Sequence, residues 1–263
     1  MIRDIEITRR NVLKGAAVGG ASLLTGAYAS AREPAPIAGD IPVSSAPTCY
    51  QTDGAFDPKA AVQAYHRLME GFGYPISDVL RSDQFWACDF VQRDFARLGM
   101  GGVFWINQKG VYGKSGAGAY DGDFKERAFG YLGHDIYLLP GQMLPEHRHL
   151  GGTEDWGPKM ESWLVRYGDV HLFGEYQYDE ETPISELPPD QRPWGYGEDW
   201  FQCKYVTHRT AKSGKIYSLL DPESWHFMRA GKQGAIVTEF ATYHNHVEFS
   251  KPGMIFDNSK AKG

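Results

Sequence analysis

Residues 141–168 read GQMLPEHRHLGGTEDWGPKMESWLVRYG and hold two histidines, His147 and His149, followed by a glutamate, Glu161. Side chains alternate along a strand, so residues two apart leave the same face and both imidazoles can reach one point. Glu161 follows a loop rich in Gly and Pro and supplies a carboxylate from the next expected strand. Two neutral nitrogens and one anionic oxygen form most of a divalent transition-metal site.

A fourth ligand must come from further along the chain, and the best candidate is His226 in the segment LDPESWHF. The order and spacing of five residues resemble the first motif of the cupin superfamily: Gly141, His147, His149, Glu161 and Gly168. The gap between the second histidine and the glutamate is longer than usual for that motif. Pro222, followed four residues later by His226, resembles the core of the second cupin motif.

The composition excludes some classes of protein. The chain has 263 residues, of which 42% are hydrophobic and 14% aromatic, as suits a packed globular protein. Its formal charge of -6 and the absence of a basic stripe argue against a nucleic-acid partner. Cys49, Cys88 and Cys203 are widely spaced and odd in number, so we expect packing residues with at most one disulfide, and no cysteine metal clip.

Residues 1–31 resemble a bacterial twin-arginine export signal. Arg9 and Arg10 precede a run of Gly, Ala, Ser and Leu, and the small residues that end at Ala31 have the form of a cleavage site. A single membrane anchor is the alternative, but the run is too short and too rich in Gly for a good spanning helix. We therefore expect the twin-arginine export machinery as a partner and a periplasmic or secreted mature protein that begins near Arg32.

The rest of the chain divides into four predicted parts: a linker or surface arm at 32–56, a helical extension at 57–100, a metal-binding domain at 101–257 and a polar tail at 258–263. Apolar residues recur at helical spacing over 58–72 and again over 84–98, which predicts two helices. The acidic, Pro-rich segment 177–202 is predicted to be a functional loop, a lid or rim of a pocket, with a tolerated, disordered insertion as the alternative.

Short runs rich in β-branched and aromatic residues predict the strands of the metal-binding domain: 102–107, 131–140, 162–167, 170–176, 203–210, 214–220, 226–229 and 235–242. Gly168 and Asp169 lie between two of these runs, which predicts a tight hairpin turn. Many short antiparallel strands behind a helical front favour a mainly β fold. We expect a cupin double-stranded β-helix, or jelly roll, with an N-terminal helical extension.

Two further polar residues are candidates for proton transfer. Glu239 has apolar neighbours on a predicted strand, where desolvation would raise its pKa towards the range of a general base, although an outward, solvated glutamate is the alternative. Lys159 lies two residues before Glu161 and would share its strand face, so it could stabilise a developing oxyanion or relay a proton. A second pair, His244 and His246, ranks lower as ligands because no matching glutamate follows.

The segments PEHRH (145–149), KMESWLVRYGDVHLF (159–173) and PESWHFMRAGKQGAIVTEF (222–240) resemble the D-lyxose isomerase family of cupin-fold sugar ketol-isomerases. The resemblance implies metal ligands at four positions, His147, His149, Glu161 and His226. It also implies active-site roles for Lys159 and Glu239. The implied metal is manganese, although Fe, Co, Ni and Zn tolerate such ligands.

The implied reaction interconverts a small aldose and its ketose, such as D-lyxose and D-xylulose or D-mannose and D-fructose, through an enediol. Trp163 and Trp225 are candidates for the wall of the sugar pocket, although an aromatic residue in a barrel is usually core. Two alternatives stay open, a cupin oxygenase that uses Fe(II) and a non-catalytic carbohydrate-binding cupin. Exposed jelly-roll faces would also suit a homodimer.

Overall fold

The protein is described by a computed structural model that covers residues 49–105, 131–151, 158–177, 180–242 and 247–256. All of these residues belong to one unit, Pro34–Gly263. The expected export signal, most of the expected linker, the pair His244 and His246 and the polar tail lie outside the described residues. Within the described ranges, no helix has the length and apolar character that crossing a bilayer requires.

The fold is mainly β, as the sequence predicted. Ten strands are present in the described residues: β1 Trp86–Cys88, β2 Met100–Phe104, β3 Tyr131–Leu138, β4 His147–Arg148, β5 Glu161–Gly174, β6 Thr182–Pro183, β7 Tyr205–Thr210, β8 Ile216–Ser218, β9 His226–Thr242 and β10 Glu248–Phe249. They pair antiparallel in the order β1-β2-β3-β9-β5-β7-β6, with β8 on β5, β4 on β9 and β10 on β4. Three short 3-10 helices complete the description: Ile184–Glu186, Pro189–Gln191 and Ala211–Ser213.

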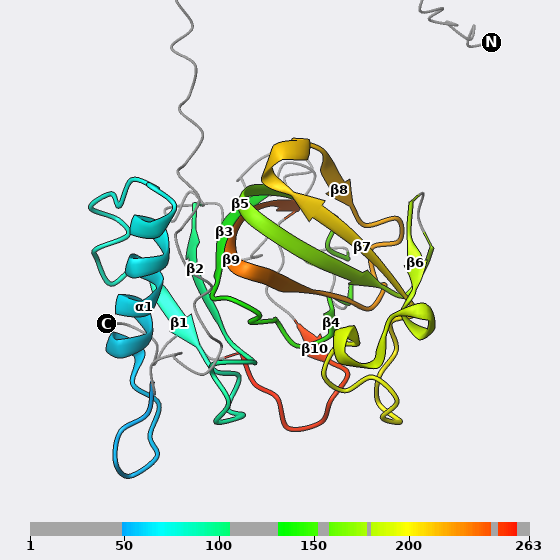
Figure 1. Cartoon of the computed structure of the whole chain (residues 1–263), viewed down its shortest axis with the longest axis horizontal. Coiled ribbons are helices and arrows are strands. Elements are labelled where there is room, and N and C mark those ends of the chain that lie inside the picture. Colours follow the sequence, from blue (N-terminus) through cyan, green and yellow to red (C-terminus); the bar gives the residue numbers. More distant parts are fainter. Residues whose placement is uncertain (1–48, 106–130, 152–157, 178–179, 243–246, 257–263) are drawn as a thin grey trace, which may run out of the picture. The chain divides into compact units, whose positions relative to one another are not determined.

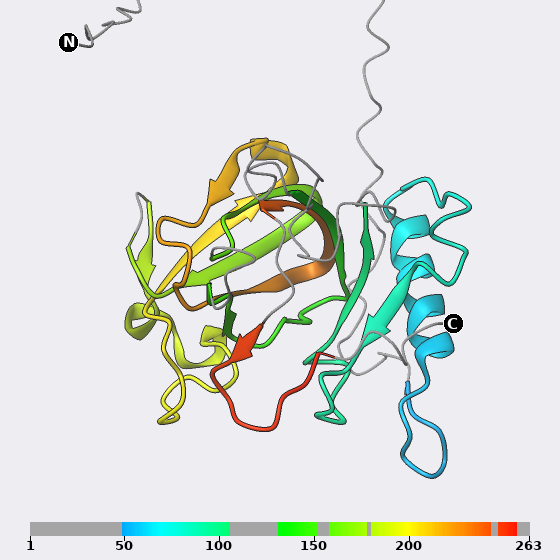
Figure 2. The same ribbon diagram turned by 180° about the vertical axis from the view of Figure 1, so that it is seen from behind.

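The first predicted helix is confirmed as α1, Pro58–Gly71. Its first turn is stabilised because the Asp57 side chain accepts a hydrogen bond from the backbone N–H of Ala60 at 3.1 Å. Tyr65 and Met69 on its apolar face are fully buried against the sheet. Figures 1 and 2 both show α1 beside β1 and β2, so this helix covers one flank of the sheet.

The second predicted helix, over 84–98, is wrong. This segment forms β1, which joins the sheet through β2, and then a series of turns. The backbone takes positive φ angles at Phe90, Val91 and Arg93, which a right-handed helix does not allow. Asp89 favours the turn because its carboxylate accepts a hydrogen bond from the Val91 N–H at 2.9 Å. The turn that begins at Asp89 is therefore incompatible with the helix that the spacing of apolar residues predicted.

The predicted hairpin at Gly168 and Asp169 is also wrong, because β5 runs through both residues as one strand. The register with β9 shifts twice here, once between Val165 and Tyr167 and once between Gly168 and Val170. Such bulges bend a strand and change which residues face inward. The two predicted strands 226–229 and 235–242 are likewise one continuous strand, β9.

The bend in the β5–β9 ribbon brings its two ends face to face. Along the ribbon, Glu161 lies opposite Ala241 and His226 lies opposite Gly174, at the other end. The side chains of Glu161 and His226 nevertheless approach to 3.0 Å, and the rings of Trp163 and His226 have centroids 5.4 Å apart. The sheet therefore curls over its own interior, as the jelly-roll prediction requires, and residues distant along the ribbon share one site.

Gly168 makes the bend possible, and its replacement should destabilise the fold. Its φ is +70°, and a Cβ there would lie 2.1 Å from the carbonyl oxygen of Gly234. We expect Gly168→Ala to lower the free energy of unfolding by about 3 kcal/mol, from backbone strain and the clash together. Chemical denaturation would measure this loss.

A matched control separates the two contributions. Gly253 has a φ of +81°, but a Cβ at this position would meet no atom within 4 Å, so Gly253→Ala tests strain alone. We expect this variant to lose only about 1 kcal/mol. Equal losses for Gly168→Ala and Gly253→Ala would contradict the role given to the close approach of β5 and β9.

Candidate active site

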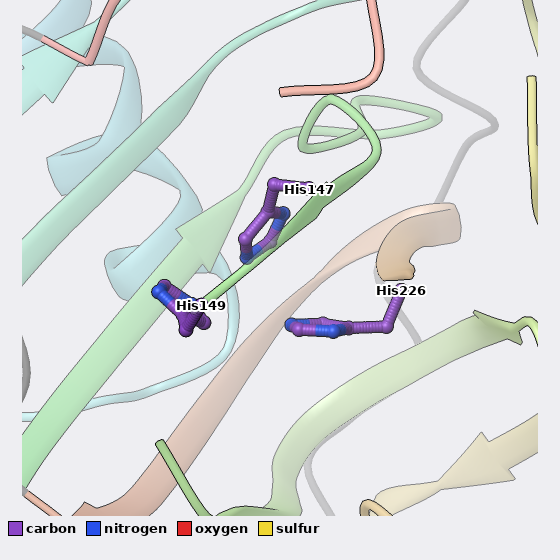
Figure 3. Close-up of side chains that lie close together, drawn as sticks. All are labelled: His147, His149 and His226. Atoms are coloured by element: carbon purple, nitrogen blue, oxygen red, sulfur yellow. The ribbon is translucent and has the colours of Figure 1, made fainter. Parts of the chain in front are cut away.

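Three histidines converge inside the curled sheet (Figure 3). His147 lies on β4, His149 follows it directly, and His226 begins β9, where it is the cross-strand partner of His147. One potential ligand atom from each histidine lies within 4.8 Å of the other two. The ring centroids are 4.4 Å apart for His147 and His226 and 5.0 Å apart for His147 and His149. The structure thus brings together the three imidazoles that the sequence singled out.

Hydrogen bonds fix which ring nitrogen each histidine presents. Nδ1 of His147 lies 2.9 Å from the carbonyl oxygen of Pro145, and Nδ1 of His226 lies 2.9 Å from that of Ser224. A carbonyl oxygen only accepts, so each Nδ1 carries the proton and each Nε2 presents a lone pair. His149 has the same tautomer, because its Nε2 accepts a hydrogen bond from Nζ of Lys159 at 3.4 Å.

Glu161 adds the carboxylate predicted as the fourth member. Its Oε1 lies 3.0 Å from Nε2 of His226 and 3.6 Å from Nε2 of His149. Oε1 of Glu161 and Nε2 of His226 are both buried, and neither has a hydrogen-bond partner among the described residues. Two lone-pair atoms that face each other without a proton between them repel, and a cation would convert that repulsion into attraction. The donor set therefore fits a divalent transition-metal ion.

The charge states of the free site suit metal binding. Burial lowers the pKa of His147 to about 3, and the neighbouring His226 adds to this effect. Burial and the positive charge of Lys159 hold the pKa of His149 well below its usual value. Burial alone would raise the pKa of Glu161, but the neighbouring positive charge of Lys159 outweighs burial and holds that pKa well below the ordinary range. His147 and His149 are therefore neutral and the glutamate is ionised near neutral pH, as metal ligands must be.

These shifts predict that the metal-free protein loses stability in mild acid. His147 has a pKa of about 3 when folded but about 6.5 when unfolded, so between these values the unfolded chain binds a proton that the folded chain does not. The free energy of unfolding should fall as the pH drops below about 6.5, by up to about 1.4 kcal/mol per pH unit for one such histidine. The low pKa of Glu161 acts in the same direction at lower pH.

Urea denaturation with a chelator at pH 7, 6 and 5 measures this effect. His147→Gln removes one of the titrating groups, so its free energy of unfolding should depend less steeply on pH than that of the unchanged chain. Identical slopes for the two proteins would show that His147 does not titrate as described.

Lys159 and Glu239 lie beside the histidine cluster as a buried ion pair. Nζ of Lys159 is 2.5 Å from Oε1 of Glu239 and 3.0 Å from Oε2 of Glu161. Glu239 is thus inward and buried, so the solvated alternative does not hold. The expected rise in its pKa is wrong, however. Burial acts to raise that pKa, but the positive charge of Lys159 outweighs it, and the net direction is downward.

His134 is a member of the site that the sequence did not reveal. It lies on β3 directly opposite Glu239 of β9, and its Nδ1 is 3.3 Å from Oε2 of that carboxylate. Its ring stacks on Trp86 and packs against Phe104, so these two neighbouring aromatic rings hold the imidazole in place. His134 can therefore orient Glu239. Only the strand register connects these two residues, which are 105 positions apart.

The two tryptophans assigned to the pocket wall lie in different surroundings. Trp163 is buried, stacks on Tyr217 and lies against His226. Trp225 is partly buried, and the guanidinium of Arg148 lies 4.4 Å from its ring centroid. Trp163 thus lines the interior next to the histidines, whereas Trp225 and Arg148 form a cation–π pair nearer the surface.

The described part of segment 177–202 is anchored next to the histidines. The carboxylate of Glu146, which precedes His147, is buried and accepts hydrogen bonds from the backbone N–H groups of Gln202 and Cys203 at 2.6 to 3.1 Å. Trp194 and Phe201 of this segment pack on the sheet cluster that contains Phe173. The described part of this segment, called the border segment below, therefore packs on the sheet and is hydrogen-bonded to the residue before His147. Cys203, Cys49 and Cys88 are buried and form no disulfide.

Comparisons with known proteins support the sugar-isomerase resemblance. The chain is 32% identical over 113 residues to a D-lyxose/D-mannose isomerase of Thermosediminibacter oceani, and 30% identical over 112 residues to a D-lyxose ketol-isomerase of Cohnella laeviribosi. Each match covers 43% of this chain and 56% of the relative. The chain thus spans about half the length of the curated relatives that it matches. A scan against descriptions of protein families finds no match.

Solved structures share the fold. An L-ribose isomerase of Cellulomonas parahominis with L-psicose superimposes with a TM-score of 0.53 at 15% identity, over 79% of this chain and 95% of that one. An L-ribose isomerase of Acinetobacter sp. DL28 in complex with L-ribose gives a TM-score of 0.53 at 17% identity, over 80% of this chain and 96% of that one. The cupin-like fold class expected from the sequence is therefore confirmed.

Proposed function

We propose that the protein is a divalent-metal-dependent aldose–ketose isomerase that acts on a small sugar. The proposal rests on one observation: a set of candidate metal ligands lies directly beside the ion pair of Lys159 and Glu239. Three histidines and Glu161 offer lone pairs to a common cation, and Lys159 links Glu161 to Glu239 through two ion pairs. The names of the matched relatives support the same reaction.

His147, His149, Glu161 and His226 would hold the metal, with manganese as the first candidate and Fe, Co, Ni or Zn as others. When bound, such an ion polarises a hydroxy-carbonyl group, so that the neighbouring C–H bond becomes acidic. Polarising the sugar in this way requires an ion that keeps net positive charge. Three neutral nitrogens and one carboxylate would leave a divalent ion with such a charge.

Glu239 and Lys159 would move the protons. The carboxylate of Glu239 accepts the proton that leaves the carbon next to the carbonyl, and returns it to the former carbonyl carbon. The ammonium of Lys159 gives a proton to the carbonyl oxygen and regains one from the neighbouring hydroxyl. An enediol lies between the two steps, and the net reaction moves hydrogen within one sugar and needs no other reactant. His134 keeps the carboxylate of Glu239 oriented.

The sugar is proposed from the relatives and is tested directly. The purified protein with Mn(II) is incubated with D-lyxose, D-mannose, D-xylulose or D-fructose, and interconversion is followed by chromatography. L-ribose joins the panel because the two solved structures described above, which share the fold, are L-ribose isomerases. Turnover that a chelator abolishes and Mn(II) restores is the expected result. If metal is bound and no sugar reacts, the isomerase proposal fails.

We also propose that the protein is exported by the twin-arginine machinery and works in the periplasm or outside the cell, where a homodimer would suit its jelly-roll faces. The proposal rests on Arg9 and Arg10 before an apolar run rich in Gly. Replacing both arginines with lysine should leave most of the protein inside the cell in a bacterial export assay. Efficient export of this double variant would contradict the proposed route.

A further inference from the structure

A second cluster of imidazole and carboxylate groups lies on β5 and β7. Asp169, His171 and His208 each place one potential ligand atom within 4.8 Å of the other two. His171 and His208 are direct cross-strand partners, with ring centroids 4.7 Å apart. Nε2 of His208 lies 2.8 Å from Oδ2 of Asp169. The two strands therefore hold three metal-binding side chains at one point.

This cluster lies on the opposite face of the sheet from the active-site histidines. Val170 and Leu172 of β5 point into the interior core that also holds Trp163. Side chains alternate along a strand, so Asp169 and His171 point outward. The border segment packs on Phe173, a residue of β5 close to His171. The cluster is thus beside the border segment, where His208 is half exposed.

Two details show that the cluster is more than a chance meeting of polar side chains. Nδ1 of His171 is buried, and no hydrogen bond in the described part of the chain satisfies it. A buried nitrogen without a partner costs free energy, and a ligand can remove that cost. In addition, a Cβ at Gly231 would lie 2.1 Å from Oδ2 of Asp169, so the absence of a side chain there admits the carboxylate.

We propose that Asp169, His171 and His208 form a second metal site, which takes a divalent transition-metal ion of the Zn²⁺ class. Two imidazoles and one carboxylate are a common donor set for Zn²⁺, and water completes a tetrahedral shell. The exposed position of His208 gives the ion access from solvent. The site is independent of the proposed isomerase chemistry, because none of its residues contacts the active-site cluster in the described structure.

One neighbouring charge opposes a cation at this point. Arg229 is the cross-strand partner of His171 on its other side. Its guanidinium donates hydrogen bonds to the backbone oxygens of Gln191 and Arg192, at 2.8 and 3.4 Å, so it is held towards the border segment. The negative charge of Asp169 lies on the cation's own side and offsets part of this repulsion.

A bound ion would tie β5 to β7. Residues 204–205 lead directly from the border segment into β7, which pairs with β5 from Tyr205 opposite Gly174 to Thr210 opposite Asp169. A metal bridge across a pair of strands adds stability that grows with the logarithm of the free metal concentration once this exceeds the dissociation constant. The expected role of the site is therefore to hold the border segment's exit strand in register.

Isothermal titration of the full chain with Zn²⁺ alone tests the proposal. His147→Ala/His149→Ala serves as the background, because it lacks two ligands of the active-site cluster. We expect this variant to bind one equivalent of Zn²⁺. Adding His208→Gln or Asp169→Asn should weaken the affinity at least tenfold, while circular dichroism shows an unchanged fold. His66→Gln, on α1 and outside both clusters, is the matched control and should leave the affinity unchanged.

The same variants in the otherwise unchanged chain keep the test valid if the background variant fails to fold. There, His208→Gln should reduce the stoichiometry from two equivalents of Zn²⁺ to one without loss of sugar turnover. Three results would overturn the proposal: a background variant that binds no Zn²⁺, an affinity that neither His208→Gln nor Asp169→Asn changes, or an equal loss with His66→Gln.

Discussion

Glu239→Gln is expected to lower kcat for sugar interconversion by about 10²- to 10⁴-fold, which is the usual contribution of a general base. Glutamine keeps the size of the side chain and can still accept a hydrogen bond from His134, which lies 3.3 Å from the carboxylate. It cannot accept a proton from a carbon atom. Lys159 keeps its second partner, Glu161, at 3.0 Å, so the buried ammonium is not left unpaired. The loss should therefore fall on the chemical step.

Two further measurements show whether Glu239 acts as this base. Metal content by elemental analysis should equal that of the unchanged chain, because Glu239 is not among the proposed ligands. Exchange of the transferred hydrogen with deuterated water should also disappear together with turnover. Glu186→Gln, the same change at an exposed residue of the 3-10 helix Ile184–Glu186, should alter neither quantity. If Glu239→Gln keeps near-normal kcat, another residue moves the proton.

The meeting of the four proposed metal ligands could be predicted because the sequence signals for it are local. His147 and His149 share a strand face by alternation alone, and the motif spacing linked them to Glu161 and His226. No local pattern marks His134, whose value depends on β3 lying beside β9 in one particular register. The direction of the Glu239 pKa was missed for a similar reason. Apolar neighbours in sequence suggested desolvation, but the nearest charge, Lys159, comes from a segment 80 residues away.

The errors in the fold have a common physical origin. A glycine followed by an aspartate between two apolar runs is typical of a hairpin, and Gly168 does take a positive φ of +70°. Here the positive φ belongs to a bulge within the continuous strand β5. The position also requires glycine because the backbone of Gly234 in β9 lies too close to leave room for a Cβ. The segment 84–98 shows the converse case, in which apolar spacing predicted a helix but the Asp89 turn prevailed. The local sequence patterns thus marked positions where the backbone departs from regular geometry, but they did not predict which structure forms there.

Glu161→Gln is expected to remove about 2.7 kcal/mol or more of the stabilisation that bound Mn(II) would give to the protein. The carboxylate is the only anion whose oxygen faces a histidine nitrogen of the cluster among the described residues, with Oε1 at 3.0 Å from Nε2 of His226. Its replacement by a neutral amide should weaken Mn(II) binding by about 100-fold or more, as loss of a ligand exceeds the 10- to 100-fold cost of losing a supporting group. At saturating metal, a 100-fold loss of affinity removes about 2.7 kcal/mol of stabilisation.

The metal-free state should respond in a different way, which gives the experiment its contrast. In the unchanged chain, Oε1 of Glu161 and Nε2 of His226 face each other as two acceptors. In the variant, the amide N–H of the glutamine can donate a hydrogen bond to Nε2 of His226, so the two side chains attract each other without metal. In the unchanged chain, the two acceptor atoms need a cation between them to attract each other. The difference in melting temperature with and without Mn(II) should therefore collapse, even though the metal-free variant remains folded. Glu186→Gln should keep the full difference. A variant that retains metal-dependent stabilisation would exclude Glu161 from the ligand set, and the isomerase proposal would then lack the carboxylate on which its charge balance depends.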